Sequence, residues 1–469
     1  MEDIVVKQKA DFADRFFGIS QSRSSIKTEV LAGITTFITI AYILILNPQI
    51  LSDPYVIMGD PVMAEKIANG VFIGTVLCAL YAKVPFAQAP GMGLNAFFAY
   101  TVVLGMGYTY GQALVIVFLS GIFFIVITAI GLREAIIRSI PDAVKMAITP
   151  GIGLFITIIG LKNAGIIISN PATLVSLVDF SQWKLEGADM MLINGALTAL
   201  IGLIIMGILH ARKVKGSILL GIVAATLIGI PLGITHLSNL DMNIGVKFRD
   251  FAEVSFMRMD FAGLFAGTNF METVFTVTML VISFSLVNMF DSIGTLLGAA
   301  RQSGMIDENG EVIRMKQALM SDAVSTLAGA MVGTSTVTTV VESSAGIAVG
   351  GRTGLTSLVT AFMFLGSILF VPIVSIVPAA ATAPALIFVG ILMLGNIREV
   401  DFSEMSNALP AFCTIVFMPF TYSIANGVAF GLITYCLMKL MTGRKQDVKA
   451  LTLVISVVFV VRYAFMTLG

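Results

Sequence analysis

The stretch VPFAQAPGMG, residues 84–93, separates two apolar regions and contains two prolines. Because proline has no backbone N–H and breaks helices, we expect an extended segment here that gives way to a helix after Gly91. The stretch GTSTVTTVV, residues 333–341, holds a similar place before another short apolar region. Its β-branched residues favour a strand. Both stretches therefore predict an extended segment followed by a short helix.

The whole chain is strongly apolar. Of its 469 residues, 57% are hydrophobic and 12% are charged, and the mean hydropathy is +0.96. A soluble globular protein carries about 25% charged residues, so this composition excludes a water-soluble enzyme. The 28 Lys and Arg residues balance 28 Asp and Glu residues and form no long basic block, which argues against a nucleic-acid-binding protein.

Few side chains are available as metal ligands or for cross-links. The three cysteines, an odd number, all lie in apolar regions, and the chain has two histidines. We therefore expect no disulfide framework, no metal site and no cofactor.

Apolar regions between charged and turn residues predict fourteen membrane spans in a single membrane domain that covers residues 1–469. We place them at 30–46, 70–84, 90–104, 112–131, 142–161, 190–209, 216–232, 272–299, 317–333, 341–352, 355–371, 379–396, 406–422 and 426–441. A further apolar region, 450–466, is interrupted by Arg462. It is either a fifteenth span or a helix at the membrane interface.

The distribution of positive charge predicts the orientation of these spans. Most of the Lys and Arg residues fall in the segments on the same side as the N-terminus. Since cytoplasmic loops are enriched in these residues, we expect a multi-pass cell-membrane protein with a cytoplasmic N-terminus. The first 29 residues are polar and mixed in charge, which does not fit a cleaved signal peptide.

The two interrupted regions are the third and the tenth of the predicted spans, so they hold the same position in two units of seven. Because seven is odd, the second unit must be inverted relative to the first. Paired interrupted spans indicate a transporter with its binding site near the middle of the bilayer. Unpaired backbone amides cannot face lipid, so the two extended segments must pair with each other or line a cavity.

Two carboxylates inside the predicted spans are the strongest candidates for that site. Asp291 lies in the middle of the eighth span, and Glu342 begins the tenth helix. A charged side chain at a helix centre costs about 2.5 to 3.5 kcal/mol on insertion scales, so such residues are usually functional. The alternative is a structural acid that bridges helices through backbone amides.

The surroundings of the two acids differ. Phe290 and Ile293 flank Asp291, and an apolar environment disfavours a charged carboxyl group. Glu342 lies at a helix N-terminus, where the dipole and free amides favour the charged form. We therefore predict that Asp291 gains and loses the transported proton and that Glu342 is a fixed hydrogen-bond acceptor.

Residues near the two acids complete the candidate site. Asn288 and Thr295 share a helix face with Asp291, because they are spaced at i−3 and i+4 from it. Ser343 directly follows Glu342.

Two further candidates come from the third span and one from the first. Asn95 offers an amide donor and acceptor, and Phe86 offers a flat surface on which a planar ligand can stack. Thr39, together with Thr35, is a candidate from the first span, although span threonines often bond to carbonyls of their own helix.

Three motifs carry a family resemblance. APGMGLNAFF at 89–98, NMFDSIGT at 288–295 and VESSAG at 341–346 resemble the nucleobase/ascorbate (nucleobase-cation symporter) transporter family, specifically its hypoxanthine-adenine-guanine permease branch. The resemblance implies an all-α fold of fourteen spans in two inverted seven-span repeats. It also implies a core subdomain, residues 30–131 and 272–371, and a gate subdomain, residues 142–232 and 379–441. Homodimers and proton symport of purine nucleobases are further implications.

The resemblance also implies roles for residues of these motifs. It implies that Asp291 and Glu342 bind the base and couple its transport to protons, and that Asn95, Phe86 and Thr295 contribute to binding. The chain has threonine at position 295, where some uracil and xanthine relatives have histidine, so the coupling details of those relatives do not transfer. The extra region 450–466 is a second departure from the plain fourteen-span plan.

The chemistry of the two acids favours a neutral purine, whose N–H groups suit carboxylate acceptors. An anion exchanger on the same fold is the chief alternative, but an anion is disfavoured beside two acids. An intramembrane aspartyl protease also needs two acids, yet neither acid here lies in a Gly-x-Gly-Asp sequence. We therefore predict proton-coupled uptake of adenine, guanine and hypoxanthine by alternating access, and no enzymatic activity.

Overall fold

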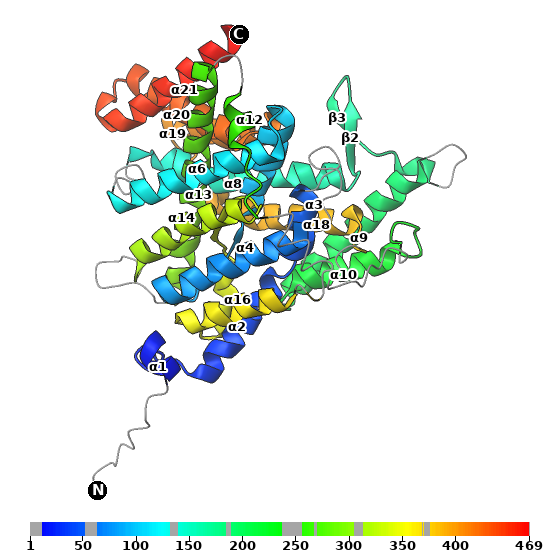
Figure 1. Ribbon diagram of the computed structural model, residues 1–469. Coiled ribbons are helices and arrows are strands. Elements are labelled where there is room, and N and C mark those ends of the chain that lie inside the picture. Colours follow the sequence, from blue (N-terminus) through cyan, green and yellow to red (C-terminus); the bar gives the residue numbers. More distant parts are fainter. Residues whose placement is uncertain are drawn as a thin grey trace.

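The structure, a computed structural model, describes residues 12–51, 63–131, 139–183, 189–236, 256–266, 270–303, 313–367, 369 and 376–468. Nearly all of this is helical (Figure 1). The longer helices are α2 (Ile26–Ile40), α3 (Ile43–Leu51), α4 (Met63–Leu77), α6 (Tyr110–Ala129), α8 (Asp142–Asn163), α9 (Met190–Ala211), α10 (Ser217–Gly229), α13 (Phe270–Ser303), α14 (Met315–Met331), α16 (Gly354–Ser367), α18 (Ala379–Leu394), α19 (Met405–Phe420), α20 (Ile424–Met441) and α21 (Ala450–Leu468).

Shorter elements connect these helices. They are the helices α1 (Phe12–Phe17), α5 (Met92–Ala96), α12 (Phe261–Phe265) and α15 (Ser343–Val349), the π-helical segments η1 (Cys78–Ala82) and η2 (Phe97–Gly105), and the 3-10 turns η3 (Phe180–Gln182), η7 (Gly395–Glu399) and η8 (Lys445–Asp447). The strands are β1 (Gln88–Pro90), β2 (Ile167–Asn170), β3 (Leu174–Leu177) and β4 (Val337–Thr339).

The prediction of a mostly helical protein with membrane-spanning helices is confirmed in its coarse form. Within the described ranges, seven helical stretches are long and apolar enough to cross a membrane, and six shorter helices are apolar. Each predicted span overlaps at least one helix. The last residues of the span predicted at 355–371 lie partly outside the described residues. The count of fourteen crossings stays a prediction.

Local sequence signals explain several helix starts. The side chain of Ser25 accepts a hydrogen bond from the backbone of Thr28 at the start of α2. Thr109 and Gln112 form a capping box at the start of α6, in which each side chain bonds the other's backbone. These caps satisfy backbone N–H groups that have no partner within the helix.

The first predicted span, 30–46, lies within one apolar helical stretch, Ile26–Leu51, that is long enough to cross a membrane. Residues 41 and 42 form a turn that divides this stretch into α2 and α3. No proline or glycine marks the turn itself. The turn places Tyr42 between two helices rather than within one.

The helices form two groups. In the first group, α2 packs against α15 and α16, α4 against α14 and α16, and α6 against α13 and α14. In the second group, α8 packs against α18 and α19, α9 against α10 and α18, and α19 against α20. The groups meet where α5 contacts α8, α3 contacts α18 and α2 contacts α10. Figure 1 shows α2 and α16 side by side in the first group, and α9 beside α10 in the second.

Two features lie outside the fourteen-span plan, of which the sequence predicted the second. Strands β2 and β3 pair as an antiparallel hairpin between α8 and α9. Region 450–466 forms most of helix α21, which packs on α20, with the Ser456 hydroxyl 3.3 Å from the Cys436 thiol. Whether α21 crosses the membrane stays a prediction.

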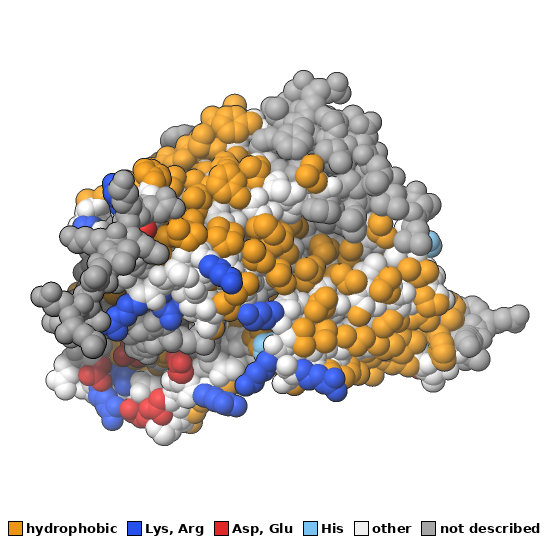
Figure 2. Space-filling model, turned by 90° about the horizontal axis from the view of Figure 1, so that it is seen from below, with side chains coloured by type: hydrophobic (Ala, Val, Ile, Leu, Met, Phe, Trp, Pro, Cys, Tyr) orange, Lys and Arg blue, Asp and Glu red, His pale blue; other side chains and the backbone are white. Residues whose placement is uncertain are grey.

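The outer surface suits a bilayer. Figure 2 shows wide areas of hydrophobic side chains, with acidic and basic side chains gathered toward one side of this face. On α10, the exposed residues Leu220, Val223 and Leu227 recur at helical spacing and form an apolar stripe. Such a stripe costs little in lipid and would be unfavourable in water.

Candidate functional site

The two stretches that interrupt the helices lie side by side. Strand β1 pairs with β4 in antiparallel register, with Ala89 opposite Thr338. The ladder continues beyond the strands, because the backbone N–H of Val340 donates to the carbonyl of Ala87 at 3.1 Å. Both strands are buried. Pairing therefore satisfies backbone groups that would otherwise be exposed to an apolar interior.

Each strand leads directly into a short helix. Gly91 is the N-cap of α5, and Glu342 is the N-cap of α15. Ser343 joins the two halves, since its hydroxyl oxygen accepts a hydrogen bond from the N–H of Ala87 at 3.0 Å. The starts of the two helices therefore flank one small antiparallel ladder.

Asp291 lies against this ladder. A Cβ atom at Gly91 would lie 3.4 Å from Oδ2 of Asp291 and 3.4 Å from Cγ2 of Thr338. As a whole residue, Asp291 is half-buried. The acids Glu342 and Asp322 interact with it electrostatically. The structure thus places Asp291 beside the start of α5, at van der Waals distance from a Cβ atom at position 91.

Glu342 is held by a residue from the first span. The hydroxyl of Tyr42 donates to Oε1 of Glu342 at 2.5 Å. Tyr42 is almost fully buried and lies at the turn between α2 and α3. The bond from Tyr42 restrains one carboxylate oxygen of Glu342, and a carboxylate can accept several hydrogen bonds.

Two asparagines place side-chain amides near the start of α5. Asn95 lies in α5 itself, and Asn47 lies in α3 and contacts strand β1. Oδ1 of Asn95 accepts a hydrogen bond from the Ser335 hydroxyl, and Nδ2 of Asn47 donates to the carbonyl of Pro90 at 3.0 Å. Among the described residues, Nδ2 of Asn95 and Oδ1 of Asn47 are buried without a hydrogen-bond partner. A buried polar atom without a partner is costly, so both atoms have capacity for a ligand or water.

The remaining predicted site residues are placed as follows. Phe86 has no exposed surface, so its ring is fully packed in this structure. Thr295 is buried one turn beyond Asp291. Thr39 donates its hydroxyl to the carbonyl of Thr35 at 2.8 Å, within its own helix. The roles of these three residues in the site stay predictions. The bond of Thr39 within its own helix favours a structural role over substrate binding.

Polar side chains of the eighth span, in α13, make hydrogen bonds to α14 and to strand β4. Nδ2 of Asn288 donates to the Thr326 hydroxyl of α14 at 2.9 Å. The Ser292 hydroxyl lies 2.7 Å from that of Thr338 in β4. These contacts fix α13 against the ladder and so fix the position of Asp291.

A third intramembrane acid was missed in the sequence. Asp322 of α14 is fully buried and accepts hydrogen bonds from Nε2 of Gln88 at 2.6 Å and from the hydroxyl of Thr339 at 2.7 Å. The backbone N–H of Thr339 also donates to it at 3.2 Å. Asp322 therefore holds both strands at once. It lies within the predicted span 317–333, where the rule applied to Asp291 would have found it.

Tyr42 was also missed, and the sequence carries no comparable signal for it, since it is one of nine tyrosines.

Within the described residues, no group of three His, Cys, Asp or Glu side chains is arranged to hold a metal ion. What the site offers is a set of acceptors and amides around two helix starts. Such a set can hydrogen-bond a planar molecule rich in N–H groups.

Comparison with known families decides the class of the protein. The Xan_ur_permease model of the permease family matches residues 27–430. The chain belongs to this permease family. It is therefore a multi-pass membrane transport protein rather than an enzyme.

Curated relatives match along almost their whole length. The adenine permease AdeP of Escherichia coli is 38% identical over 458 residues, which cover 96% of this chain and 96% of that protein. The guanine/hypoxanthine permease PbuO of Bacillus subtilis is 38% identical over 459 residues, which cover 95% of this chain and 99% of that protein. The resemblance read from the three sequence motifs is thereby confirmed.

Solved structures of the same fold are more distant. The transmembrane domain of the cyanobacterial bicarbonate transporter BicA superimposes with a TM-score of 0.61 at 17% identity, covering 87% of this chain and 97% of that one. SLC26A9 superimposes with a TM-score of 0.60 at 13% identity, covering 94% of this chain and 73% of that one. At these identities the similarity shows the fold alone.

Proposed function

We propose that this permease takes up the purine nucleobases adenine, guanine and hypoxanthine across the cell membrane, coupled to protons. The observation that carries the proposal is the placement of Asp291 and Glu342 beside the two short helices α5 and α15, in a chain whose relatives are named as permeases of these bases. The ring N–H and exocyclic amine groups of a purine suit carboxylate acceptors.

A second candidate is transport of an anion, because BicA is described as a bicarbonate transporter. In an anion carrier of this fold, the helix N-termini would be left free to face the anion. Here Glu342 is the N-cap residue of α15, although its side chain makes no capping hydrogen bond, and Asp291 lies beside the start of α5. Two carboxylates in these positions favour a neutral ligand over an anion.

The movement that we propose is a shift of a core subdomain against a gate subdomain. The core comprises residues 30–131 and 272–371, and the gate comprises residues 142–232 and 379–441. Support comes from the two helix groups, since α2, α4, α6, α13, α14, α15 and α16 pack together, as do α8, α9, α10, α18, α19 and α20. The site lies in the first group and contacts the second through α5 and α8.

The two units of seven spans are proposed to be inverted repeats. Support comes from the matched elements β1–α5 and β4–α15, each of which is a strand followed by a short helix. We propose a cytoplasmic N-terminus on the charge distribution of the sequence. The homodimer implied by the family resemblance stays a prediction, which light scattering of the purified protein tests.

Proton coupling rests on Asp291. Protonation neutralises the carboxyl group and lowers the cost of moving it through the membrane interior. A sodium site would need several convergent oxygens, and we identify no such set in the sequence.

Uptake into proteoliposomes tests the proposal. Radiolabelled adenine, guanine, hypoxanthine, uracil and sulfate are offered under an inward proton gradient or an inward sodium gradient. We expect accumulation of the purines that is abolished by a protonophore and independent of sodium. Sulfate uptake without purine uptake would overturn the substrate assignment, and purine uptake that requires sodium but resists the protonophore would overturn the coupling.

A further inference from the structure

Glu29 of α2 is a buried acid that the proposed mechanism does not use. Its side chain has no exposed surface. Oε1 accepts a hydrogen bond from the backbone N–H of Arg352 at 3.0 Å. Oε2 accepts from the N–H of Thr353 at 3.2 Å and from the hydroxyl of Thr356 at 2.6 Å. Glu29 therefore binds the turn that joins α15 to α16.

The same turn also closes the C-terminal end of α15. Nη1 of Arg352 donates to the carbonyls of Ile347 at 2.7 Å and Gly351 at 2.8 Å. A cation at the last carbonyls of a helix is favourable because these groups carry the negative end of the helix dipole. Gly350 ends the helix with a φ of +115°, which side chains rarely adopt, and its carbonyl accepts from the Ser24 hydroxyl at 3.2 Å. The segment around the start of α2 thus encloses the end of α15.

The middle of α15 touches α2 without room for a side chain. A Cβ atom at Gly346 would lie 2.0 Å from Oγ1 of Thr36 and 2.6 Å from the carbonyl oxygen of Ala32. Both distances are shorter than real Cβ contacts. The two helices therefore pack backbone against backbone, which allows little relative movement.

Tyr42 makes the third contact, at the N-terminal end of α15, through its hydrogen bond to Glu342. The polypeptide from Ser24 to Tyr42 thereby holds α15 at its C-terminal end, its middle and its N-terminal end. Helix α15 has only seven residues, a length of about 10 Å. A change at one end of so short a helix moves the other end.

We propose that Glu29 is a positioning residue, which fixes α15 through the Arg352–Thr353 turn and so sets the position of Glu342 for the substrate. This inference rests on the proposed function, in which Glu342 accepts hydrogen bonds from a purine. Glu29 does not touch the substrate. Its carboxylate is required because both oxygens accept hydrogen bonds, and the amide nitrogen of a glutamine cannot accept one.

The test compares E29Q with the matched variant T360V. The hydroxyl of Thr360 of α16 lies 3.0 Å from the carbonyls of Gly33 and Thr356, so T360V removes a contact between α2 and α16 that involves neither the turn nor the Glu29 carboxylate. The milder variant T356V removes one donor to Glu29 and covers the case in which E29Q does not fold. For each purified protein, calorimetry gives the Kd for hypoxanthine and adenine, and hydrogen exchange of the free protein gives the protection of residues 343–349.

We expect E29Q to raise the Kd about tenfold, because a displaced Glu342 would lose one charge-assisted hydrogen bond to the purine, and T356V to raise it less. T360V should leave the Kd within about twofold. In the free protein, E29Q should speed exchange in α15, and T360V should not. The inference fails if E29Q keeps both the wild-type Kd and the wild-type exchange of α15, or if T360V changes both as much as E29Q does. A wild-type protein that binds no purine contradicts the proposed function instead, while the exchange data still test the role of Glu29 in holding α15.

Discussion

The hydroxyl of Tyr42 donates a hydrogen bond of 2.5 Å to Oε1 of Glu342, although the two residues are 300 positions apart in the chain. The bond links the turn that breaks the first helical stretch to the start of the short helix α15. The bond restrains one oxygen of a carboxylate that can accept further hydrogen bonds.

Replacing Tyr42 by phenylalanine should weaken purine binding, because the ring stays and only the donor to Glu342 is lost. Hydrogen bonds to charged groups contribute about 1.5 to 3 kcal/mol, but this one is present without ligand, so only the part that orients Glu342 is lost from binding and we expect a Kd up to about tenfold higher by calorimetry. Tyr435→Phe is the control, since it removes the hydrogen bond that Tyr435 donates to the carbonyl of Asp447 at 3.3 Å, a bond that does not involve Glu342. Equal binding by both variants would show that Tyr42 does not orient the acid.

Replacing Asp322 by asparagine should destabilise the strand pair. The donors from Gln88 and Thr339 all bond to Oδ1, so the amide oxygen of asparagine can take its place, but these bonds then lose the negative charge that strengthens them. Hydrogen bonds to charged groups contribute about 1.5 to 3 kcal/mol and neutral ones about 0.5 to 1.5 kcal/mol, so we expect a lower thermal unfolding temperature in detergent together with reduced uptake. Asp142→Asn is the matched control, because Asp142 is exposed and pairs with Lys145 at the start of α8. An Asp322→Asn protein as stable and active as the control would contradict the role given to Asp322.

A disulfide between α5 and α8 should stop transport. A Cβ atom at Gly93 would lie 3.9 Å from Cβ of Ile152, within the range of disulfide geometry. The pair Gly93→Cys and Ile152→Cys joins the proposed core to the proposed gate, so oxidation should block uptake and a reducing agent should restore it.

The control for this disulfide lies within the gate. A Cβ atom at Gly195 of α9 would lie 3.7 Å from Cβ of Ala380 of α18. The pair Gly195→Cys and Ala380→Cys should form a disulfide that leaves uptake intact. If mass spectrometry shows complete cross-linking of positions 93 and 152 while uptake continues, the two subdomains do not move against each other at this contact.

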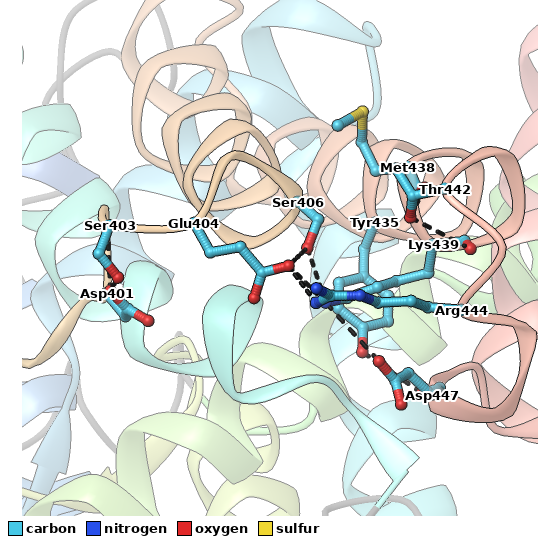
Figure 3. Close-up of polar contacts among 10 residues, drawn as sticks. All are labelled: Asp401, Ser403, Glu404, Ser406, Tyr435, Met438, Lys439, Thr442, Arg444 and Asp447. Atoms are coloured by element: carbon cyan, nitrogen blue, oxygen red, sulfur yellow. Dashed lines mark hydrogen bonds and ion pairs between the residues drawn. The ribbon is translucent and has the colours of Figure 1, made fainter.

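A charged cluster links the start of α19 to the end of α20 (Figure 3). Glu404 accepts hydrogen bonds from the Ser406 hydroxyl at 2.6 Å and from Arg444, and Nζ of Lys439 lies 3.8 Å away. The bond from Ser406, together with the cations of Arg444 and Lys439, holds the pKa of Glu404 below its usual range.

A lowered pKa gives this cluster a defined pH dependence. The contribution of Glu404 to stability is fully present above the pKa of an unfolded glutamate, about 4.3, and is lost as the pH falls through the lower folded value. The unfolding temperatures of the wild type and Glu404→Gln should therefore differ at pH 7 and converge below about pH 4. A difference that widens as the pH falls would contradict this assignment.

Much of the fold could be predicted from the sequence because the apolar regions are long and their boundaries are charged. The stretch 84–93 contains two prolines, and the stretch 333–341 is β-branched, so the extended segments before α5 and α15 have visible causes. The hairpin of β2 and β3 was not predicted, because its strands of four residues are too short to stand out among longer apolar regions.

The site was predictable only where a residue type is unusual for its surroundings. Asp291 and Glu342 stand out as acids within apolar regions, and Asp322 has the same signal. Tyr42 does not stand out, because a tyrosine is common in a membrane protein and its partner is distant in sequence. The packing of Gly346 against Thr36 depends on the relative position of two helices, which local sequence patterns do not contain.

Purine binding and transport by Asp291→Asn and Glu342→Gln test the roles of the two acids most directly, with calorimetry for affinity and proteoliposomes for counterflow and accumulation. Asparagine resembles the protonated acid, so Asp291→Asn should bind purine and support counterflow but should not accumulate purine against a gradient. Glu342→Gln should lose about 1.5 to 3 kcal/mol of binding free energy, because a charge-assisted hydrogen bond is lost. The account is contradicted if Asp291→Asn abolishes binding while Glu342→Gln binds like the wild type and cannot accumulate purine.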